Sequence, residues 1–538
     1  MTDTTDQNKG PVDLSTAKVI SDTFFVSFSR ILVLLMKPVR GIILGRLLGP
    51  ALYGILNIPV PYVNILKLLS NIGFNTAVVK LVPAYRQKGR MDLARMILRS
   101  TAALTVTLGA LWSILIVVLA PQIAERIAHR PDALNPIRLY ALIIPFLAMN
   151  TFYISAYLAV QRGKLQGAIT LWHGVLQVAL PLAFILIRRS VTLVIGGLVA
   201  AEVIGTILFA VYLGRRGLAG FGGGTGPLAR GAAGSGAETG PLGRGMREVW
   251  GFGRLFFFTD LGWMMIHSVD KLMVQNLLDI EQYGFYAMAA LVITGLSTIA
   301  TTGGIALVPS LTVARESGDA AAFRRQARNT ARLGFIVLVP IVAMIIVLIG
   351  DFFAIVLPRF VPSVPVIRTL ACIGFVLVFS RVAWATLVAY GRGTAASIAY
   401  IFAAVWNVAW NWILIPPYGI VGAAMATLST FIVLALVLQI LMYRVSREWV
   451  GIGGLIHAVL ISLLFPILGW LMPGAGHLLR IISVTVTGCV LYGILSLVTR
   501  LVRAADLEKV TIALRPRAHV PHVHAALGLI GLLRRIAR

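Results

Sequence analysis

The stretch Leu47-Leu48-Gly49-Pro50-Ala51-Leu52-Tyr53-Gly54 returns about 230 residues later as Leu277-Leu278-Asp279-Ile280-Glu281-Gln282-Tyr283-Gly284. Two further segments repeat at nearly the same offset. Gln161-Arg162-Gly163 returns as Gly391-Arg392-Gly393, and Arg95, Arg99, Thr101 and Ala102 match Arg324, Arg328, Thr330 and Ala331. An offset kept at three separate places indicates an internal repeat, so we expect two similar halves.

The apolar content of the chain exceeds that of soluble proteins. Hydrophobic residues make up 58% of the 538 residues, charged residues make up 12%, and the mean hydropathy is +0.89. Soluble domains carry about 45–50% apolar and about 25% charged residues. The excess runs nearly from end to end, which excludes a soluble enzyme with a membrane tail, a coiled coil and a disordered chain. An all-α polytopic membrane protein is therefore predicted.

Fourteen apolar stretches are long enough to cross a bilayer, because a spanning helix needs about 20 residues. They fall at 16–44, 55–83, 97–120, 139–160, 168–187, 192–213, 249–274, 283–308, 332–350, 364–388, 397–415, 421–443, 455–472 and 481–502. We expect an N-lobe of six spans at 16–213, a C-lobe of six at 249–443, and two further spans within 444–502. Six is an even number, so the copies run parallel, as in two-lobed transporters that bind cargo near the membrane midplane.

The segments outside the spans are predicted from charge and composition. Basic residues collect in the loops after spans two, four, six, eight and twelve, so the positive-inside rule places both termini in the cytoplasm. Residues 1–15 form an N-terminal tail, 214–248 a Gly-rich linker, and 503–538 a basic amphipathic tail. The net charge of +27 is not clustered with aromatic residues, which argues against nucleic acid. The tail holds His519, His522 and His524 without a neighbouring carboxylate or cysteine, so no metal site is predicted.

Charged residues within the first two spans form a candidate binding surface. An ionisable side chain at the bilayer centre costs about 2.5–3.5 kcal/mol and usually faces a cavity or a partner. Span one carries Arg30, Lys37 and Arg40 on one face, and span two carries Asn64, Lys67 and Asn71 at helical spacing. Asp22 is the one embedded acid expected in this lobe. The surface therefore suits a phosphate or diphosphate head group, although Lys37 and Arg40 could instead extend to the membrane interface and anchor their helix.

The second half carries its own embedded polar residues. Further candidates for the head-group site are Arg254, Asp260 and Lys271 on span seven and Arg381 on span ten. Asp260, Asp270 and Lys271 could equally form an internal salt bridge. The oxygens of Asn407, Asn411 and Thr427 could coordinate a small hard cation. Residue types alone favour hydrogen bonds between helices at those three positions.

Several motifs together resemble one transporter family. They are Arg46-Leu47-Leu48-Gly49-Pro50 with Tyr53-Gly54, then Asp270-Lys271 with Tyr283-Gly284, and then Pro417-Tyr418-Gly419-Ile420-Val421-Gly422-Ala423-Ala424. In this order and spacing the chain, over about 16–502, resembles the polysaccharide and lipid-linked oligosaccharide flippases of the multidrug/oligosaccharidyl-lipid/polysaccharide exporter superfamily.

The resemblance implies a flippase of the prokaryotic cytoplasmic (inner) membrane. It would move a polyprenyl-(di)phosphate-linked glycan to the outer leaflet by alternating access, alongside a glycosyltransferase or a polysaccharide polymerase. In related lipid II flippases, basic residues of the first helices bind the diphosphate, and Arg40 falls at one such position. The next residue in this chain is Gly41, whereas those flippases have an acidic residue there. That branch also holds a sodium ion between spans seven, eleven and twelve, a pattern that Asp270, Asn407, Asn411 and Thr427 resemble with an amide in place of an acid. Na⁺ or H⁺ is thus the expected coupling ion, and no other cofactor is implied.

Three other functions remain as alternatives. A lipid II flippase and a multidrug exporter share the twelve-span core, but multidrug exporters bind cations against embedded acids, whereas the first lobe is predicted to be basic. A membrane glycosyltransferase or ligase needs a sizeable extramembrane region, and the predicted outer loops are short. A transporter rather than an enzyme is therefore predicted.

Overall fold

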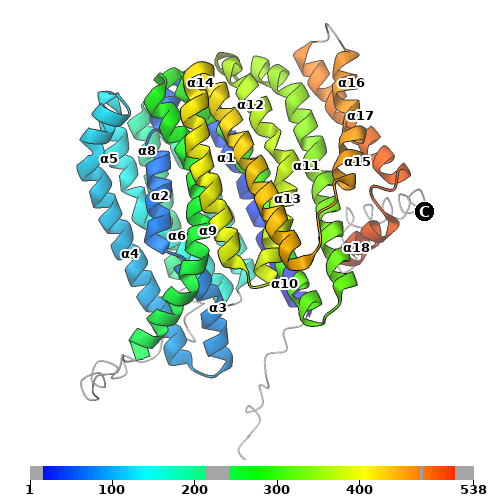
Figure 1. Cartoon of the computed structure of the whole chain (residues 1–538). Coiled ribbons are helices and arrows are strands. Elements are labelled where there is room, and N and C mark those ends of the chain that lie inside the picture. The colour runs from blue at the N-terminus through cyan, green and yellow to red at the C-terminus, as the bar shows by residue number, and fades with distance from the viewer. Residues whose placement is uncertain (1–15, 161, 213–240, 473, 475, 515–538) are drawn as a thin grey trace, which may run out of the picture. The chain divides into compact units, whose positions relative to one another are not determined.

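The computed structural model describes residues 16–160, 162–212, 241–472, 474 and 476–514, and these are almost entirely helical (Figure 1). Eleven helical segments among them are long and apolar enough to cross a membrane. The predicted spans at 397–415 and 421–443 are counted together as Gly393–Ser446, the predicted span at 55–83 is broken into shorter helices, and the predicted span at 249–274, within the helix Pro241–Leu277, is not among the eleven. The prediction of an all-α polytopic membrane protein is confirmed.

The chain divides into two compact units. Unit 1 comprises Met1–Arg40 and Ile58–Phe257, and unit 2 comprises Gly41–Asn57 and Phe258–Arg538. Two helices contribute to both units, α1 (Thr16–Asn57) and α9 (Pro241–Leu277). Most of the Gly-rich linker and most of the C-terminal tail, including its three histidines, lie outside the described residues.

The other helices of unit 1 are α2 (Val60–Asn71), α3 (Phe74–Gln87), α4 (Met91–Gln122), α5 (Leu134–Ala141), α6 (Ile143–Ala159), α7 (Gly163–Ile187) and α8 (Val191–Tyr212). One apolar core joins α3, α4, α6 and α8 through side chains such as Phe74, Phe152 and Phe209. The Tyr157 hydroxyl donates a hydrogen bond to the Phe209 carbonyl oxygen in this core, at 2.9 Å. Burial of large aromatic side chains therefore fixes these four helices against one another.

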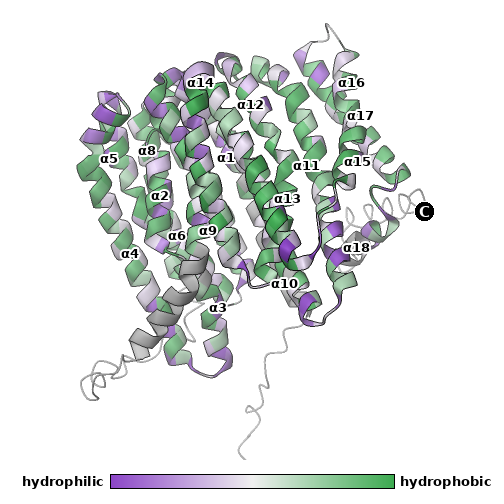
Figure 2. Cartoon of the chain, viewed as in Figure 1, coloured by the Kyte–Doolittle hydropathy of each residue, from purple (hydrophilic) through white to green (hydrophobic). Residues whose placement is uncertain are grey.

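The other helices of unit 2 are α10 (Ile280–Glu316), α11 (Ala320–Val356), α12 (Val364–Ala371), α13 (Ile373–Ala389), α14 (Gly393–Ser446), α15 (Gly453–Ser462), α16 (Leu464–Trp470), α17 (His477–Val498) and α18 (Ala504–Leu514). The helices α15, α16 and α17 pack beside α11 (Figure 1). Figure 2 shows apolar residues along the helices and polar residues gathered at turns such as those between α3 and α4 and between α10 and α11.

Three helix breaks occur at residues with positive φ. Gly49 (φ 78°) interrupts α1 immediately before Pro50, and Gly419 (φ 57°) interrupts α14 after Pro416 and Pro417. The break between α2 and α3 falls at Ile72 and Gly73. Glycine suits such conformations because it has no Cβ. The two segments of α14 on either side of Gly419 are not one continuous helix, since side chains 23 residues apart form hydrogen bonds between them, as Trp406 Nε1 does with the Ser429 hydroxyl, at 3.3 Å.

The two copies of the repeated motif cross each other within unit 2. A Cβ added to Gly54 would overlap the Ile280 carbonyl oxygen, and a Cβ added to Gly284 would overlap the Pro50 carbonyl oxygen. The Tyr283 hydroxyl also donates to the Asn57 carbonyl oxygen, at 2.9 Å. The repeated glycines are thus the points at which two backbones approach too closely for any side chain.

Candidate functional site

Unit 1 contains a buried carboxylate that the sequence analysis missed. Glu202 of α8 is only 3% exposed and accepts hydrogen bonds from Asn150 Nδ2, at 2.6 Å, and from Gln177 Nε2. His173 Nε2 lies 3.2 Å from Glu202 Oε2, the oxygen that also accepts from Asn150. The expectation that Asp22 is the one embedded acid of this lobe is therefore wrong. A lone Glu barely lowers the hydropathy of α8, and its partners come from α6 and α7, so no local pattern reveals the cluster.

Close helix packing makes room for this carboxylate. A Cβ at Gly205 would collide with the His173 ring, and a Cβ at Gly197 would collide with the backbone at Leu180 and Pro181. Small residues let α7 and α8 approach closely enough for side-chain hydrogen bonds between them. The Thr206 hydroxyl donates to the Glu202 carbonyl oxygen, at 2.8 Å, and to Asn150 Oδ1, at 3.0 Å. All the polar groups around Glu202 are thereby held in fixed orientations.

The predicted basic residues of unit 1 gather around Glu202. Lys37 and Lys67 interact electrostatically with each other and with Glu202, although they belong to different helices. Arg40 Nη1 donates to the Gln177 carbonyl oxygen, at 3.1 Å, and thus ties α1 to the residue that holds Glu202. Three basic side chains thus lie near one carboxylate. We call Lys37, Arg40, Lys67 and Glu202 the unit 1 charge cluster.

The remaining unit 1 candidates lie on or beside this cluster. Asn64, Lys67 and Asn71 share one face of α2. Asn71 is buried, and its amide nitrogen donates to the Lys67 carbonyl oxygen, at 3.2 Å. Its Oδ1 atom is buried without a hydrogen-bond partner among the described residues. The side chains of Asp22, Arg30 and, on α9, Arg254 lie outside the described residues.

Unit 2 brings a second set of predicted residues together around Trp263. Arg381 of α13 stacks on the Trp263 ring at 4.0 Å from its centroid and is 9% exposed. Its Nε and Nη2 atoms are buried and have no hydrogen-bond partner in the described part of the chain. The Lys271 ammonium group donates a hydrogen bond to the His267 carbonyl oxygen. No ion pair joins Asp260, Asp270 and Lys271 within this part of the chain, so the alternative of an internal salt bridge is not observed.

The predicted cation-site residues occupy a buried polar cluster in unit 2. Asn407 and Asn411 are fully buried, and Asn411 Nδ2 donates to Asn407 Oδ1, at 3.0 Å. Asn407 Nδ2 donates to Thr430, at 3.1 Å, so a hydrogen bond between the two segments of α14 is present. The Tyr286 hydroxyl donates a hydrogen bond to the Asp270 carboxylate, at 2.6 Å, and forms another with the side chain of Thr427. Asn411 Oδ1 is buried and has no hydrogen-bond partner within the described residues.

The polar residues of the two units suit ligands of opposite charge. Unit 1 gathers cations around one acid and could hold an anion. Unit 2 gathers neutral oxygens beside one carboxylate and could hold a small hard cation. Unit 2 also presents the buried guanidinium of Arg381.

Comparisons with known proteins place this fold among membrane transporters. The lipid II flippase MurJ in an inward closed conformation matches with a TM-score of 0.66 and 12% identity, over 88% of this chain and 98% of that chain. An inward-facing multidrug resistance MATE family transporter of the MOP superfamily matches with a TM-score of 0.59 and 14% identity, over 80% and 99%. A MOP superfamily transporter from Pyrococcus furiosus matches with a TM-score of 0.54 and 12% identity, over 80% and 94%.

The chain therefore has the fold of the multi-pass transporters of the MOP superfamily. Residues 19–315 match the family model of the polysaccharide biosynthesis proteins. The chain belongs to the polysaccharide biosynthesis protein family. No curated protein sequence shows significant similarity to it. The predicted family is confirmed.

Proposed function

We propose that this protein is a flippase for a polyprenyl-(di)phosphate-linked oligosaccharide. It moves its cargo from the cytoplasmic to the outer leaflet of a prokaryotic inner membrane by alternating access, with both termini in the cytoplasm. Glycosyltransferases supply the cargo and a polysaccharide polymerase uses it. The family supports the biosynthetic role, and the MOP fold supports the transport. The observation that carries the proposal is the unit 1 charge cluster, in which Lys37, Arg40 and Lys67 exceed their one counter-ion.

The cluster can bind a phosphate or diphosphate reversibly. Embedded cations are costly without a counter-ion, and Glu202 offsets part of their charge when no cargo is bound. A diphosphate competes with Glu202 for the ammonium groups of Lys37 and Lys67 and supplies the missing negative charge. Arg254, Asp260, Lys271 and Arg381 are proposed as further residues that bind the head group. Binding is thus strong enough for recognition and weak enough for release.

Flipping of a polyprenyl-diphosphate oligosaccharide in proteoliposomes tests this role. The variant Lys37→Gln plus Lys67→Gln keeps side chains of similar length and removes two charges. We expect at least about a tenfold lower rate, because each lost charge-assisted hydrogen bond contributes about 1.5–3 kcal/mol. The control Lys88→Gln plus Lys164→Gln removes two exposed lysines and should flip normally. Equal rates for the two double variants would refute the head-group site.

We further propose that Asp270, Asn407, Asn411 and Thr427 bind the coupling ion, Na⁺ or H⁺. The unpartnered Asn411 Oδ1 and the nearby Asp270 carboxylate support a cation here. Replacing Thr427 by Val preserves shape and removes one oxygen, so any sodium dependence of flipping should fall severalfold. Thr499→Val, at the end of α17, is the control. A sodium dependence that survives in Thr427→Val would exclude this site.

A multidrug exporter is the second candidate function, because Glu202 is an embedded acid of the kind that binds cationic drugs. Drug resistance that is lost in Glu202→Gln and kept in Lys37→Gln plus Lys67→Gln would favour it. One of the structural relatives is a lipid II flippase, so this function is a further alternative. Rescue of a strain depleted of its own lipid II flippase would support that alternative, and we expect no rescue.

A further inference from the structure

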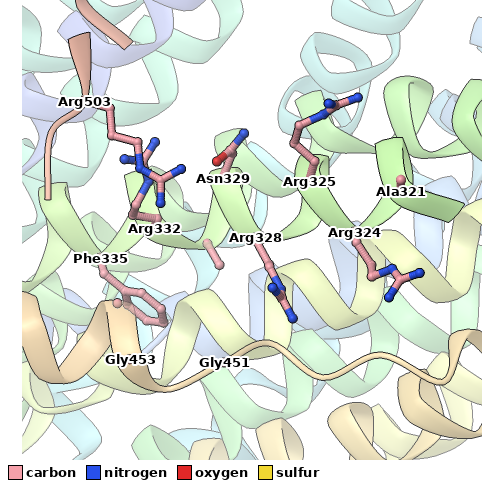
Figure 3. A pocket seen from close by; sticks show the side chains of 12 residues that line it. Ala321, Arg324, Arg325, Arg328, Asn329, Arg332, Phe335, Gly451, Gly453 and Arg503 are labelled. Carbon is pink, nitrogen blue, oxygen red and sulfur yellow. The ribbon is translucent and has the colours of Figure 1, made fainter. Parts of the chain in front are cut away.

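Unit 2 contains a cavity of about 590 Å³ that lies away from the residues discussed above. One face of the first turns of α11 forms one wall, and the turn between α14 and α15 forms another (Figure 3). Its size falls within the range of small-molecule sites, about 300–1,000 Å³. Its lining includes five arginines, namely Arg324, Arg325, Arg328, Arg332 and Arg503.

The charge of this arginine pocket is not balanced by acids. Glu448 pairs with Arg324, at 3.1 Å, and Asp506 pairs with Arg332, at 2.7 Å. Five arginines less two acids leave a net charge of +3. Arg328 and Arg503 form no ion pair with any acid in the described part of the chain. Arg332 Nε is buried without a hydrogen-bond partner there, so the pocket has unused donors as well as unused charge.

A helix N-terminus adds further donors. Helix α15 begins at Gly453, and no side chain caps it. Gly451, Gly453 and Gly454 line the cavity, and a Cβ added to Gly451 or Gly453 would meet no atom within 4 Å. The first backbone N–H groups of a helix lack partners within the helix and attract anions. Figure 3 shows Arg324 and Arg328 extending from α11 toward this segment.

We propose that the arginine pocket binds a phosphate group, at a site separate from the unit 1 charge cluster. Guanidinium groups bind phosphate oxygens bidentately. The first backbone N–H groups of α15 favour an anionic ligand as well. The lining residues come from the segments that follow the eighth, twelfth and fourteenth predicted spans, all at the ends that the positive-inside rule assigns to the cytoplasm. Both the head group of an anionic phospholipid and a soluble phosphate compound meet this chemistry there. Basic pockets between helices on that side of membranes bind anionic head groups.

Two probes applied to the full-length protein in detergent distinguish these sources. Inorganic pyrophosphate, measured by calorimetry, represents a soluble compound. Phosphatidylglycerol, measured by native mass spectrometry against phosphatidylcholine, represents a lipid. The test variant is Arg328→Gln plus Arg503→Gln, which removes two of the three pocket arginines that form no ion pair within the described residues. We expect it to bind at least one of the two probes about tenfold more weakly than the wild type.

The internal repeat supplies a matched control. Arg99 is the counterpart of Arg328 in the first half of the chain, and Arg444 is another exposed arginine of unit 2; neither lines the pocket. Arg99→Gln plus Arg444→Gln lowers the net charge equally and should bind like the wild type. The size-exclusion profile and melting temperature of each variant establish that it is folded.

The outcomes separate cleanly. Loss of pyrophosphate binding in the pocket variant assigns a soluble phosphate compound, and loss of phosphatidylglycerol binding assigns a lipid head group. Equal binding by pocket and control variants overturns the proposal. Binding that is lost instead in Lys37→Gln plus Lys67→Gln also overturns it, because the probe then occupies unit 1. Neither result depends on whether the protein flips an oligosaccharide.

Discussion

Glu202 is the clearest case of a residue that only the folded chain explains. The basic residues Lys37, Arg40 and Lys67 could be predicted, because charges inside apolar spans stand out in the sequence. Glu202 stands out in the same way within the predicted span 192–213, but its pairing with these residues could not be predicted, because its partners come from α6 and α7. The hydrogen bonds of Asn150, Gln177 and His173 are formed between helices, and spacing along one helix carries no information about them.

Glu202→Gln tests how much this residue contributes to the stability of the folded protein. The substitution keeps the shape but removes the charge that Lys37 and Lys67 face, and it turns one acceptor into a donor. We expect the free energy of unfolding to fall by about 1–3 kcal/mol, because charge-assisted hydrogen bonds are lost in a buried site. The melting temperature, followed by tryptophan fluorescence, reports this loss. Glu125→Gln, an exposed acid in the same unit, should melt like the wild type, and an unchanged Glu202→Gln would contradict the prediction.

At the scale of helices, hydropathy located the spans but not their breaks. Bilayer thickness dictates the length of an apolar stretch, so all fourteen predicted stretches fall on helices. The interruptions at Gly49 and at Ile72 depend on local backbone geometry instead, and the predicted span at 55–83 is therefore divided between α1, α2 and α3. Hydropathy also carries no information on which unit a segment packs with, and Gly41–Asn57 groups with unit 2.

The crossing of the repeated motifs yields a prediction at this scale. Gly54→Ala and Gly284→Ala each add a Cβ that overlaps a backbone carbonyl oxygen, at Ile280 and at Pro50. Neither carbonyl group can move like the end of a side chain, so the helices must separate, at a cost of about 1–3 kcal/mol. Melting temperature and yield of folded protein should both fall. Gly295→Ala, where an added Cβ meets no atom within 4 Å, should leave both unchanged.

At the scale of the whole molecule, the repeat and the composition predict a two-lobed polytopic membrane protein. The resemblance of the motifs at 46–54, 270–284 and 417–424 adds the family, which the family model confirms, and the structural comparisons agree with the fold. The arginine pocket was beyond this reasoning. Its walls come from α11, from the start of α15 and from the segment before α18, which are far apart in the sequence.

Membrane orientation is the prediction that belongs to this scale. In a background without Cys372 and Cys489, Ser317→Cys should react with a membrane-impermeant maleimide only from the cytoplasmic side. Asp132→Cys should react only from the outside, because both positions are exposed and lie at opposite ends of predicted spans. Labelling of both cysteines from the same side would rule out the predicted topology.

The contact between the two motif copies has a symmetry of its own. Gly54 meets Ile280 as Gly284 meets Pro50, so each copy contributes the same two positions in the same roles. Such an isologous pairing is the pattern by which two identical chains associate around a two-fold axis. Here both partners belong to one polypeptide and can change separately during evolution. A larger residue at either glycine forces the same pair of backbones apart. The sequences of the two halves can therefore diverge elsewhere, but both must keep glycine at this crossing.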